Sequence, residues 1–195
     1  MNPILRDFPD HFETLRLLIR APQPGDGKML YDAVIESLEH LKPWMPWAHQ
    51  EITLEAEEGV VRRMHANFLT REDLPLFILK KDSGEFVGGS GLHRFDWDVP
   101  RFEIGYWVRQ RFEGKGYITE AAAGITRFAF QTLHAERIEI RMDDRNRRSW
   151  RVAERLNFTL EGILRRDARD TNGALRDTRI YSMIRSEWLQ QNPTR

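Results

Sequence analysis

Two glycines between an apolar strand and a helix are the residues of this sequence best suited to bind a phosphate. Gly114 and Gly116 lie in the loop 111–116, which follows the strand-like segment 102–108 and precedes apolar residues at helical spacing over 117–133. Glycine lets the backbone approach a ligand closely, and the free N–H groups of a helix's first turn attract anions. This order predicts a pyrophosphate-binding loop, although the same glycines also suit a tight strand-to-helix turn.

The two commoner phosphate loops do not fit this sequence. Neither GxxxxGKS nor GxxxxGKT is present, and no GxGxxG follows an early strand with an acidic residue about 20 positions later. Arginine is concentrated further along the chain, with seven arginines against four acids over 137–155. That segment suits a phosphate-bearing cofactor or a nucleic-acid backbone, or it forms a solvated surface of ion pairs.

Hydrophobic periodicity and turn residues predict the elements that would position the glycine loop. The predicted strands cover 14–21, 76–80, 86–92, 102–108, 137–142, 158–164 and 175–184. The predicted helices cover 26–41, 54–69, 117–133 and 149–156. This mixed order of strands and helices predicts an α+β (mixed α/β) fold, in a single domain over residues 1–195.

Composition limits the classes of function. The chain of 195 residues has 30 basic and 30 acidic side chains, and this balance argues against a general binder of nucleic acids or membranes. It contains no cysteine, which excludes disulfides, thiolate metal sites and a cysteinyl intermediate. The histidines form no HxH or HExxH cluster, so no metal site is expected. Because neither a secretory signal nor a membrane-length apolar run is visible, we expect a soluble, cytoplasmic protein.

Four segments, in the same order along the chain, resemble the GNAT-type N-acetyltransferase superfamily. They are LKPWMPWA at 41–48, EIGYWV at 103–108, GKGYITEA at 114–121, and Asn146-x-x-Ser149 followed by ERLNF at 154–158. Together they resemble its ribosomal-protein-serine/alanine N-terminal acetyltransferase (Rim-type) branch. The resemblance implies a central, mixed, mostly antiparallel sheet flanked by helices, with acetyl-CoA wedged between splayed central strands and no metal.

The resemblance also implies which residues hold acetyl-CoA. The glycines of the loop and the neighbouring N–H groups would cradle the pyrophosphate, and the exposed edge of the strand at 107–108 would carry the pantetheine arm. The implied cofactor-binding residues are Trp107, Val108, Arg111, Phe112, Glu113, Gly114, Lys115, Gly116, Tyr117, Ile118, Thr119, Asn146 and Ser149.

Acetyl transfer from a thioester to an amine needs a base for the amine and a proton for the departing thiolate. Glu103 lies in an apolar strand, where desolvation would raise the pKa of its carboxyl, and the resemblance implies that it takes the amine proton through a water molecule. An ordinary ion pair with a neighbouring arginine is the other interpretation of Glu103. The resemblance implies that a tyrosine shortly after the start of this helix gives the thiolate its proton, but no tyrosine falls between Asn146 and Phe158, so Ser149 is the candidate partner of the thiolate. Asn146 equally suits a simple helix cap.

Two tryptophans in the loop after the first long helix are candidates for the acceptor site. Trp44 and Trp47 lie beside two prolines, and large aromatic side chains fill either a core or a pocket. The resemblance favours the pocket, where these tryptophans and Glu103 would contact the substrate. In the second long helix, Met64 and the pair 68–69 are expected to face the core.

The family usually has glycine immediately before Phe158, where this chain has Asn157. The position looks like a helix C-terminus that needs a left-handed residue, and asparagine is the next best choice after glycine. The departure therefore leaves the assignment of the site unchanged.

These features predict an enzyme that transfers an acetyl group from acetyl-CoA to the N-terminal α-amine of a protein, such as a ribosomal protein, by direct attack in a ternary complex. Another acceptor class is a small amine such as a polyamine or an aminoglycoside, which a narrow acidic pocket would favour over an open groove. The arginine-rich segment leaves a non-catalytic CoA or nucleic-acid sensor as a further alternative. We expect neither a nucleic-acid nor a membrane partner, and the resemblance implies a tendency to form homodimers.

Overall fold

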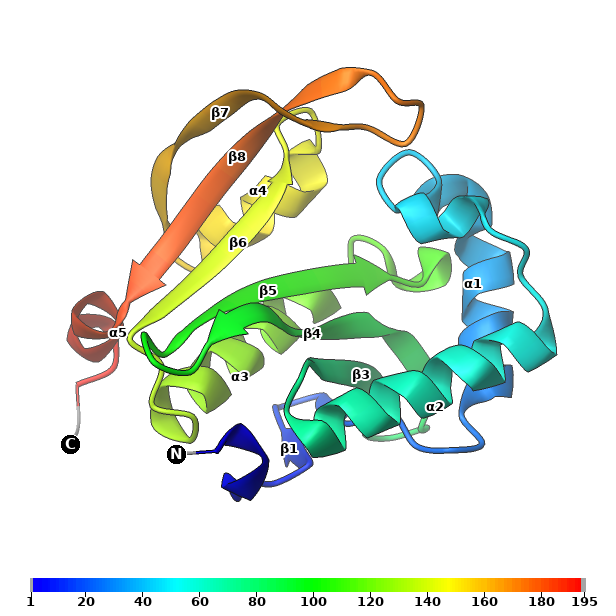
Figure 1. Cartoon of the computed structure of the whole chain (residues 1–195), viewed down its shortest axis with the longest axis horizontal. Helices are drawn as coiled ribbons and strands as arrows, with labels where there is room; N and C mark the ends of the chain where they lie inside the picture. Colours follow the sequence, from blue (N-terminus) through cyan, green and yellow to red (C-terminus); the bar gives the residue numbers. More distant parts are fainter. Residues whose placement is uncertain (1, 194–195) are drawn as a thin grey trace.

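Strands from both ends of the chain form one sheet in the computed structural model, which describes residues 2–193. The strand order is β1-β2-β3-β4-β5-β6-β8-β7, and every neighbouring pair is antiparallel except β5 and β6 (Figure 1). The strands are β1 (His11–Glu13), β2 (Leu17–Arg20), β3 (Leu74–Lys80), β4 (Phe86–Asp96), β5 (Arg101–Val108), β6 (Arg137–Asp143), β7 (Thr159–Arg169) and β8 (Leu175–Ile184). The predicted mixed α/β fold with a mostly antiparallel sheet is confirmed.

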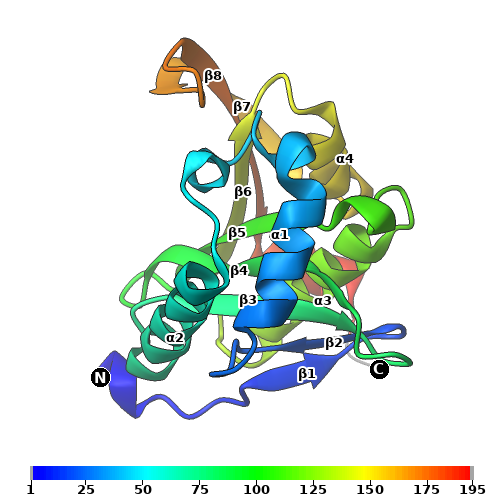
Figure 2. The ribbon, with the colours of Figure 1, turned by 90° about the vertical axis from the view of Figure 1, so that its right-hand side faces the viewer.

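Helices cover both faces of the sheet, and Figure 2 shows α2 and α3 on opposite sides of β3, β4 and β5. The α-helices are α1 (Gly27–Leu41), α2 (Leu54–Thr70), α3 (Tyr117–Gln131), α4 (Arg147–Arg155) and α5 (Arg185–Gln191). Short 3-10 helices are η1 (Pro3–Leu5), η2 (Pro46–His49) and η3 (Gln110–Phe112). The four predicted helices therefore exist close to their predicted bounds.

Two clusters of buried apolar side chains hold these layers together. The smaller cluster joins α1 and α2 to one face of the sheet through residues such as Val34, Val61 and Phe86. The larger cluster packs α3 on the other face, where Ile125 is fully buried with Ile104 and other strand residues. The apolar stripe of α3 that the sequence shows is thus the side that faces the sheet.

Three details differ from the sequence-based expectations. The first strand was expected over 14–21, but it begins at Leu17, and the three residues of β1 precede it as a separate strand. The α5 helix was not predicted, because seven residues are too few to show a helical period. Leu69 is 55% exposed, so its expected place in the core was wrong. Phe68 takes the buried position on α2, and the next residue is rotated by about 100° away from it.

The sheet opens between β5 and β6. These strands pair only at Arg101–Arg137, Phe102–Ile138 and Glu103–Glu139. Beyond these pairs β5 stays bonded to β4 as far as Val108, and β6 stays bonded to β8 as far as Asp143. Figure 1 shows the two strands separating beyond this point. The splayed central strands that the family resemblance implied are present.

Candidate functional site

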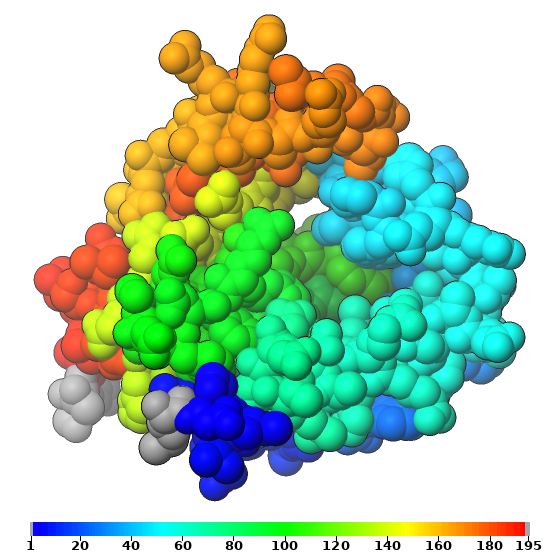
Figure 3. All heavy atoms as spheres, in the orientation of Figure 1, coloured from blue at the N-terminus to red at the C-terminus, as the bar shows by residue number. Residues whose placement is uncertain are grey.

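The space between the separated strands opens into a cavity of about 1820 Å³. Its wall includes the C-terminal end of α1, the loop with η2, the middle of β4 and β5, the start of α3, the end of β6 and one side of α4. Figure 3 shows the hollow between the α1–α2 connection, the β4–β5 region and the β7–β8 hairpin. Residues far apart in the sequence therefore converge on one cleft.

The glycine loop forms one end of this cavity. Gly114 and Gly116 have φ of +71° and +78°, a left-handed conformation that other residues rarely adopt. Within residues 2–193, the backbone N–H groups from Gly114 to Thr119 have no protein acceptor, and the helical bonds begin with Glu120 N–H donating to Gly116 O at 3.1 Å. Unpaired donors at a helix N-terminus fit the phosphates of a coenzyme A molecule.

Most of the predicted cofactor-binding residues line the cavity, and two do not. The lining residues are Trp107, Val108, Phe112, Glu113, Gly114, Gly116, Tyr117, Ile118, Thr119, Asn146 and Ser149. Lys115 and Arg111 lie outside it. The guanidinium of Arg111 instead binds Glu36 of α1, with Nε 2.9 Å from Oε1, and this contact holds the pKa of the Glu36 carboxyl below its ordinary value. Arg111 thus ties the loop to α1.

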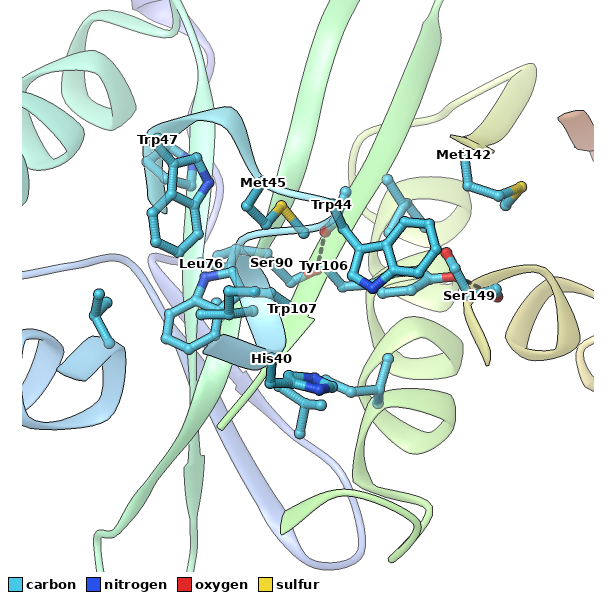
Figure 4. Close-up of a pocket in the computed structure, with 18 of the residues that line it drawn as sticks. His40, Trp44, Met45, Trp47, Leu76, Ser90, Tyr106, Trp107, Met142 and Ser149 are labelled. Atoms are coloured by element: carbon cyan, nitrogen blue, oxygen red, sulfur yellow. Dashed lines mark hydrogen bonds between the residues drawn. The ribbon is translucent and has the colours of Figure 1, made fainter. Parts of the chain in front are cut away.

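Ser149 is fixed by two neighbours. Asn146 caps α4, because its Oδ1 accepts a hydrogen bond from Ser149 N–H at 3.1 Å, as the capping interpretation of the sequence proposed. The Ser149 hydroxyl donates to Tyr106 Oη at 3.3 Å, and the Tyr106 hydroxyl donates to the Ser149 carbonyl at 2.8 Å (Figure 4). Burial raises the pKa of the Tyr106 hydroxyl, which therefore stays protonated.

Sequence reasoning missed Tyr106 as a site residue. The family resemblance directed attention to tyrosines in segment 146–158, whereas the tyrosine that contacts Ser149 is Tyr106 of β5. The signal that was available is the strand alternation, which places Tyr106 on the opposite face from Glu103.

Glu103 has both the desolvated carboxyl and the arginine ion pair that were considered for it from the sequence. Desolvation raises the pKa of its carboxyl, and the charge of Arg94 opposes this rise. The Arg94 guanidinium Nη1 lies 3.2 Å from Glu103 Oε2, and the Glu103 side chain is only 16% exposed. The glutamate does not line the cavity, although Ile104, Arg94 and Arg141 do. Any action of Glu103 on a substrate in the cavity therefore needs an intermediate group.

Trp44 and Trp47 both line the cavity and are half-buried. The ring of Trp47 lies 5.7 Å from that of Trp107 in an edge-to-face arrangement, and it packs against the smaller apolar cluster. Figure 4 shows both indoles on the same loop as Met45. Trp47 therefore serves the core and the cavity wall at the same time.

Three further ionisable residues on the cavity wall were not identified from the sequence. His93 of β4 binds Asp73, with Nδ1 2.8 Å from Oδ1, and the two residues are 20 positions apart. Glu57 of α2 is only 7% exposed, and no residue within 2–193 forms a hydrogen bond with its carboxylate. No local spacing in the sequence connects any of these residues to the site.

Residues 2–193 show neither a metal-binding cluster nor a membrane-spanning helix. These residues contain no group of three or more histidine, aspartate or glutamate side chains placed to hold a metal ion. None of the helices between residues 2 and 193 has both the length and the apolar character needed to span a membrane.

Comparison with known proteins connects this cavity to a family. Residues 16–159 match the family model described as an acetyltransferase (GNAT) domain. The YdaF protein of Bacillus subtilis (strain 168), which carries a provisional name as a ribosomal N-acetyltransferase, is 31% identical over 176 residues, covering 88% of this chain and 93% of YdaF. The ribosomal protein uS5-alanine N-acetyltransferase of Escherichia coli (strain K12) is 26% identical, covering 90% of this chain and 91% of its own.

A solved structure with a bound donor shares the fold. The microcin C7 self-immunity acetyltransferase MccE, crystallised with acetyl-CoA and AMP, superposes with a TM-score of 0.83 over 91% of this chain and 97% of its own, at 24% identity. At this identity the similarity supports the arrangement of strands and helices rather than a shared substrate.

Proposed function

The chain belongs to the GNAT acetyltransferase family and takes acetyl-CoA as its donor, and on this premise we propose that it acetylates the N-terminal α-amine of a protein, such as a ribosomal protein. Transfer would occur by direct attack of the amine in a ternary complex, because the chain has no cysteine to carry an acyl intermediate. Relatives named for ribosomal N-acetylation match nearly the whole chain and support this acceptor class.

The observation that carries the proposal is the continuous cavity between the phosphate loop and the tryptophan loop. One end presents unpaired N–H groups at Gly114 and Gly116, and the other end is walled by Trp44 and Trp47. Between them lies the free edge of β5, which can accompany a pantetheine arm as far as the point where the sheet opens. The same cavity thus offers contacts for a donor at the glycine loop and for an acceptor beside the tryptophans.

The acceptor end suits a flexible peptide terminus. Residues from α2 and from the β7–β8 hairpin both contribute to its wall, so the cleft is open along the side opposite the phosphate loop (Figure 3). Glu55, Glu57 and Asp73 line the cavity together with arginines such as Arg63 and Arg94, so an ammonium group would meet carboxylates within a wall of mixed charge. An extended N-terminus can enter such a cleft with its first residue at the reaction centre.

Bound acetyl-CoA would supply the electrophilic thioester carbon. We propose that Ser149, held by Tyr106, hydrogen-bonds the departing sulfur, and that Glu103 assists removal of the amine proton through an intermediate group. The one hydrogen of the Ser149 hydroxyl is donated to Tyr106 Oη in the structure, so it would turn from Tyr106 to the sulfur as the C–S bond breaks.

The arginine-rich segment gives little support to a nucleic-acid sensor. Arg137 pairs with Glu161, Arg141 with Asp167, and Arg145 with both Asp143 and Asp170. Paired arginines attract phosphates less than free ones. Ion pairs therefore account for these three arginines, whereas Arg151 and Arg155 line the cavity, where a phosphate-bearing donor would bind.

The experiment that tests the proposal is an acceptor screen. CoA release from acetyl-CoA is measured with peptides that begin with serine, alanine and other residues, with polyamines and with aminoglycosides, and each product is identified by mass. We expect rapid acetylation of one class of peptide. Rapid acetylation of a small amine alone would replace the protein acceptor, and tight CoA binding without any acetylation would support a sensor.

A further inference from the structure

The imidazole of His93 lies on a platform made by two glycines. Gly91 of β4 and Gly105 of β5 are register partners, and the ring covers both of them. A Cβ atom built on Gly91 would come within 2.7 Å of His93 Nε2, and one built on Gly105 would come within 3.1 Å of Cδ2. Any side chain at Gly91 would therefore displace the ring, and one at Gly105 would crowd it.

Asp73 fixes the orientation of this ring. Its two carboxylate oxygens lie 2.8 and 3.0 Å from His93 Nδ1, so a proton on Nδ1 is held by the carboxylate. Nε2 is then the unprotonated nitrogen of the neutral imidazole and a proton acceptor. Both side chains line the cavity and are about one-third exposed, so the ring borders the space that a bound substrate would occupy.

The position of the ring relates it to the reaction centre. His93, Gly105 and Trp107 belong to one face of the sheet, whereas strand alternation puts Tyr106 and its partner Ser149 on the other face. A thioester at the free edge of β5 would therefore have His93 on one side and the Ser149 hydroxyl on the other. The two groups could then act on different atoms, His93 on the attacking amine and Ser149 on the departing sulfur.

We propose that His93, oriented by Asp73, is the base that removes the proton from the attacking amine. The inference rests on the proposed function, because it names the base of that same acetyl transfer. Glu103 pairs with His93 in the β4–β5 register, on the same face of the sheet, and does not line the cavity, so its carboxylate would act on the imidazole rather than contact the amine. His93 is thus the intermediate group between the amine and Glu103.

The step balances in atoms and charge. The amine nitrogen forms a bond to the carbonyl carbon and gives one proton to His93 Nε2. The C–S bond breaks with its electron pair on sulfur, and the thiolate takes up a proton from solvent, relayed through the Ser149 hydroxyl. The imidazolium then returns its proton to solvent, which restores the neutral ring.

Several charged groups lie near the imidazole. Asp73 precedes β3, Glu103 lies beside it on β5, and Arg94 follows it on β4. Arg63 of α2 and Arg141 of β6 also line the cavity.

The test compares His93→Gln and Asp73→Asn with the wild-type chain, using the peptide acceptor found in the screen. We expect His93→Gln to lower kcat by about 100-fold or more while the Kd of acetyl-CoA is unchanged. Asp73→Asn keeps the imidazole of His93 but no longer fixes the proton on Nδ1. We expect this variant to lower kcat by at least about tenfold. Added imidazole should restore part of the activity in His93→Gly. The wild-type pH profile of kcat/KM should contain a limb that His93→Gln lacks.

His65→Gln is the matched control, because His65 bonds the Pro22 carbonyl through Nδ1 at 2.8 Å and lies outside the cavity. Its activity should equal that of the wild type. Folding of each variant is checked by its circular dichroism and by its acetyl-CoA affinity. Wild-type activity retained in His93→Gln, or a pH profile unchanged by it, would overturn the proposal. A wild-type chain that acetylates no amine would instead overturn the proposed function.

Discussion

Gly114 and Gly116 decide by their backbone conformation whether the donor can bind. A Cβ on Gly114 would meet no atom within 4 Å, so the requirement comes from its positive φ and from the closeness of the bound phosphate rather than from protein packing. We predict that Gly116→Val reduces acetyl-CoA affinity by at least about 100-fold, as measured by calorimetry, because it tilts the donor N–H groups and fills the cradle.

Gly84 provides the matched control for this substitution. It has φ +70° in the β3–β4 turn and lies outside the cavity, and a Cβ there would meet no atom within 4 Å, whereas one on Gly116 would meet only Arg16 Nη2 at 3.6 Å. Gly84→Val should lose about 1–2 kcal/mol of folding free energy through the same backbone strain, with unchanged acetyl-CoA affinity. Equal affinity losses in both variants would mean that strain alone explains the effect at Gly116.

Glu103 does not line the cavity, so loss of its carboxylate should lower turnover more than it weakens acetyl-CoA binding. We predict that Glu103→Gln lowers kcat roughly tenfold, less than His93→Gln, because it removes a charge that stabilises the protonated base. The Kd of acetyl-CoA should stay within about twofold of the wild-type value. A parallel loss of kcat and acetyl-CoA affinity would assign Glu103 a purely structural role.

The buried carboxyl of Glu57 should make the folding stability of the protein depend on pH. Burial raises the pKa of its carboxyl above the ordinary 4.5, so the folded state binds this proton more tightly than the unfolded state. The contribution of Glu57 to stability is therefore fully present below pH 4.5 and is lost as the pH rises through the folded-state pKa. We predict that Glu57→Gln raises Tm by about 2 °C at pH 7, and that the difference shrinks toward pH 4. A rise in Tm that is the same at pH 4 and pH 7 would exclude the raised pKa of Glu57 as its cause.

Single residues also show the reach of sequence reasoning. The glycine loop was predictable because its strand, turn and helix are contiguous, and Asn157 was correctly assigned a left-handed conformation, with φ +59°. The pairs His93–Asp73 and Tyr106–Ser149 were not predictable, because each depends on strands brought together only by the sheet register. Contacts across the sheet leave no fixed spacing in the chain.

The α4 helix shows how an element positions the site. Its first turn is held by the Asn146 cap, and Ser149 lies within that turn. We predict that Asn146→Ala destabilises the protein by about 1 kcal/mol in urea unfolding and lowers kcat because Ser149 loses its orientation. Asn146→Asp should retain both stability and most activity. An alanine variant of unchanged stability would contradict the capping role.

Element length decided which parts of the fold the sequence revealed. The 15 residues of α3 show a clear apolar stripe, whereas the three residues of β1 and the seven of α5 are too short to show a period. The α5 helix is held instead by Trp188, which stacks on Phe130 at 5.4 Å. Tertiary packing of this kind cannot be inferred from a local pattern.

The whole molecule consists of two parts of one sheet joined at β5 and β6 through three residue pairs. A donor that contacts the loop after β5 and the start of α4 would connect these parts beyond the junction. We predict that acetyl-CoA at 100 times its Kd adds about 2.7 kcal/mol to the unfolding free energy, which raises Tm by roughly 5–10 °C. Gly116→Val should show no such increase, and an equal increase there would place the donor elsewhere.

The single-domain interpretation of residues 1–195 remains a prediction. Strands from the N-terminal and C-terminal thirds share one sheet, and α3 and α4 pack on it from the middle of the chain. Because the junction of β5 and β6 lies at the cavity, we expect donor binding and folding of both parts to be coupled in one unfolding transition.

The most direct measurement is acetylation of a matched pair of peptides, analysed by mass spectrometry. Both peptides begin with serine or alanine and contain one internal lysine, and in one of them the α-amine is blocked. We predict that the free peptide gains one acetyl group at its α-amine, at a rate that depends on acetyl-CoA, while the blocked peptide gains none. Acetylation of the blocked peptide, or no acetylation of either peptide despite tight acetyl-CoA binding, would contradict N-terminal acetyl transfer.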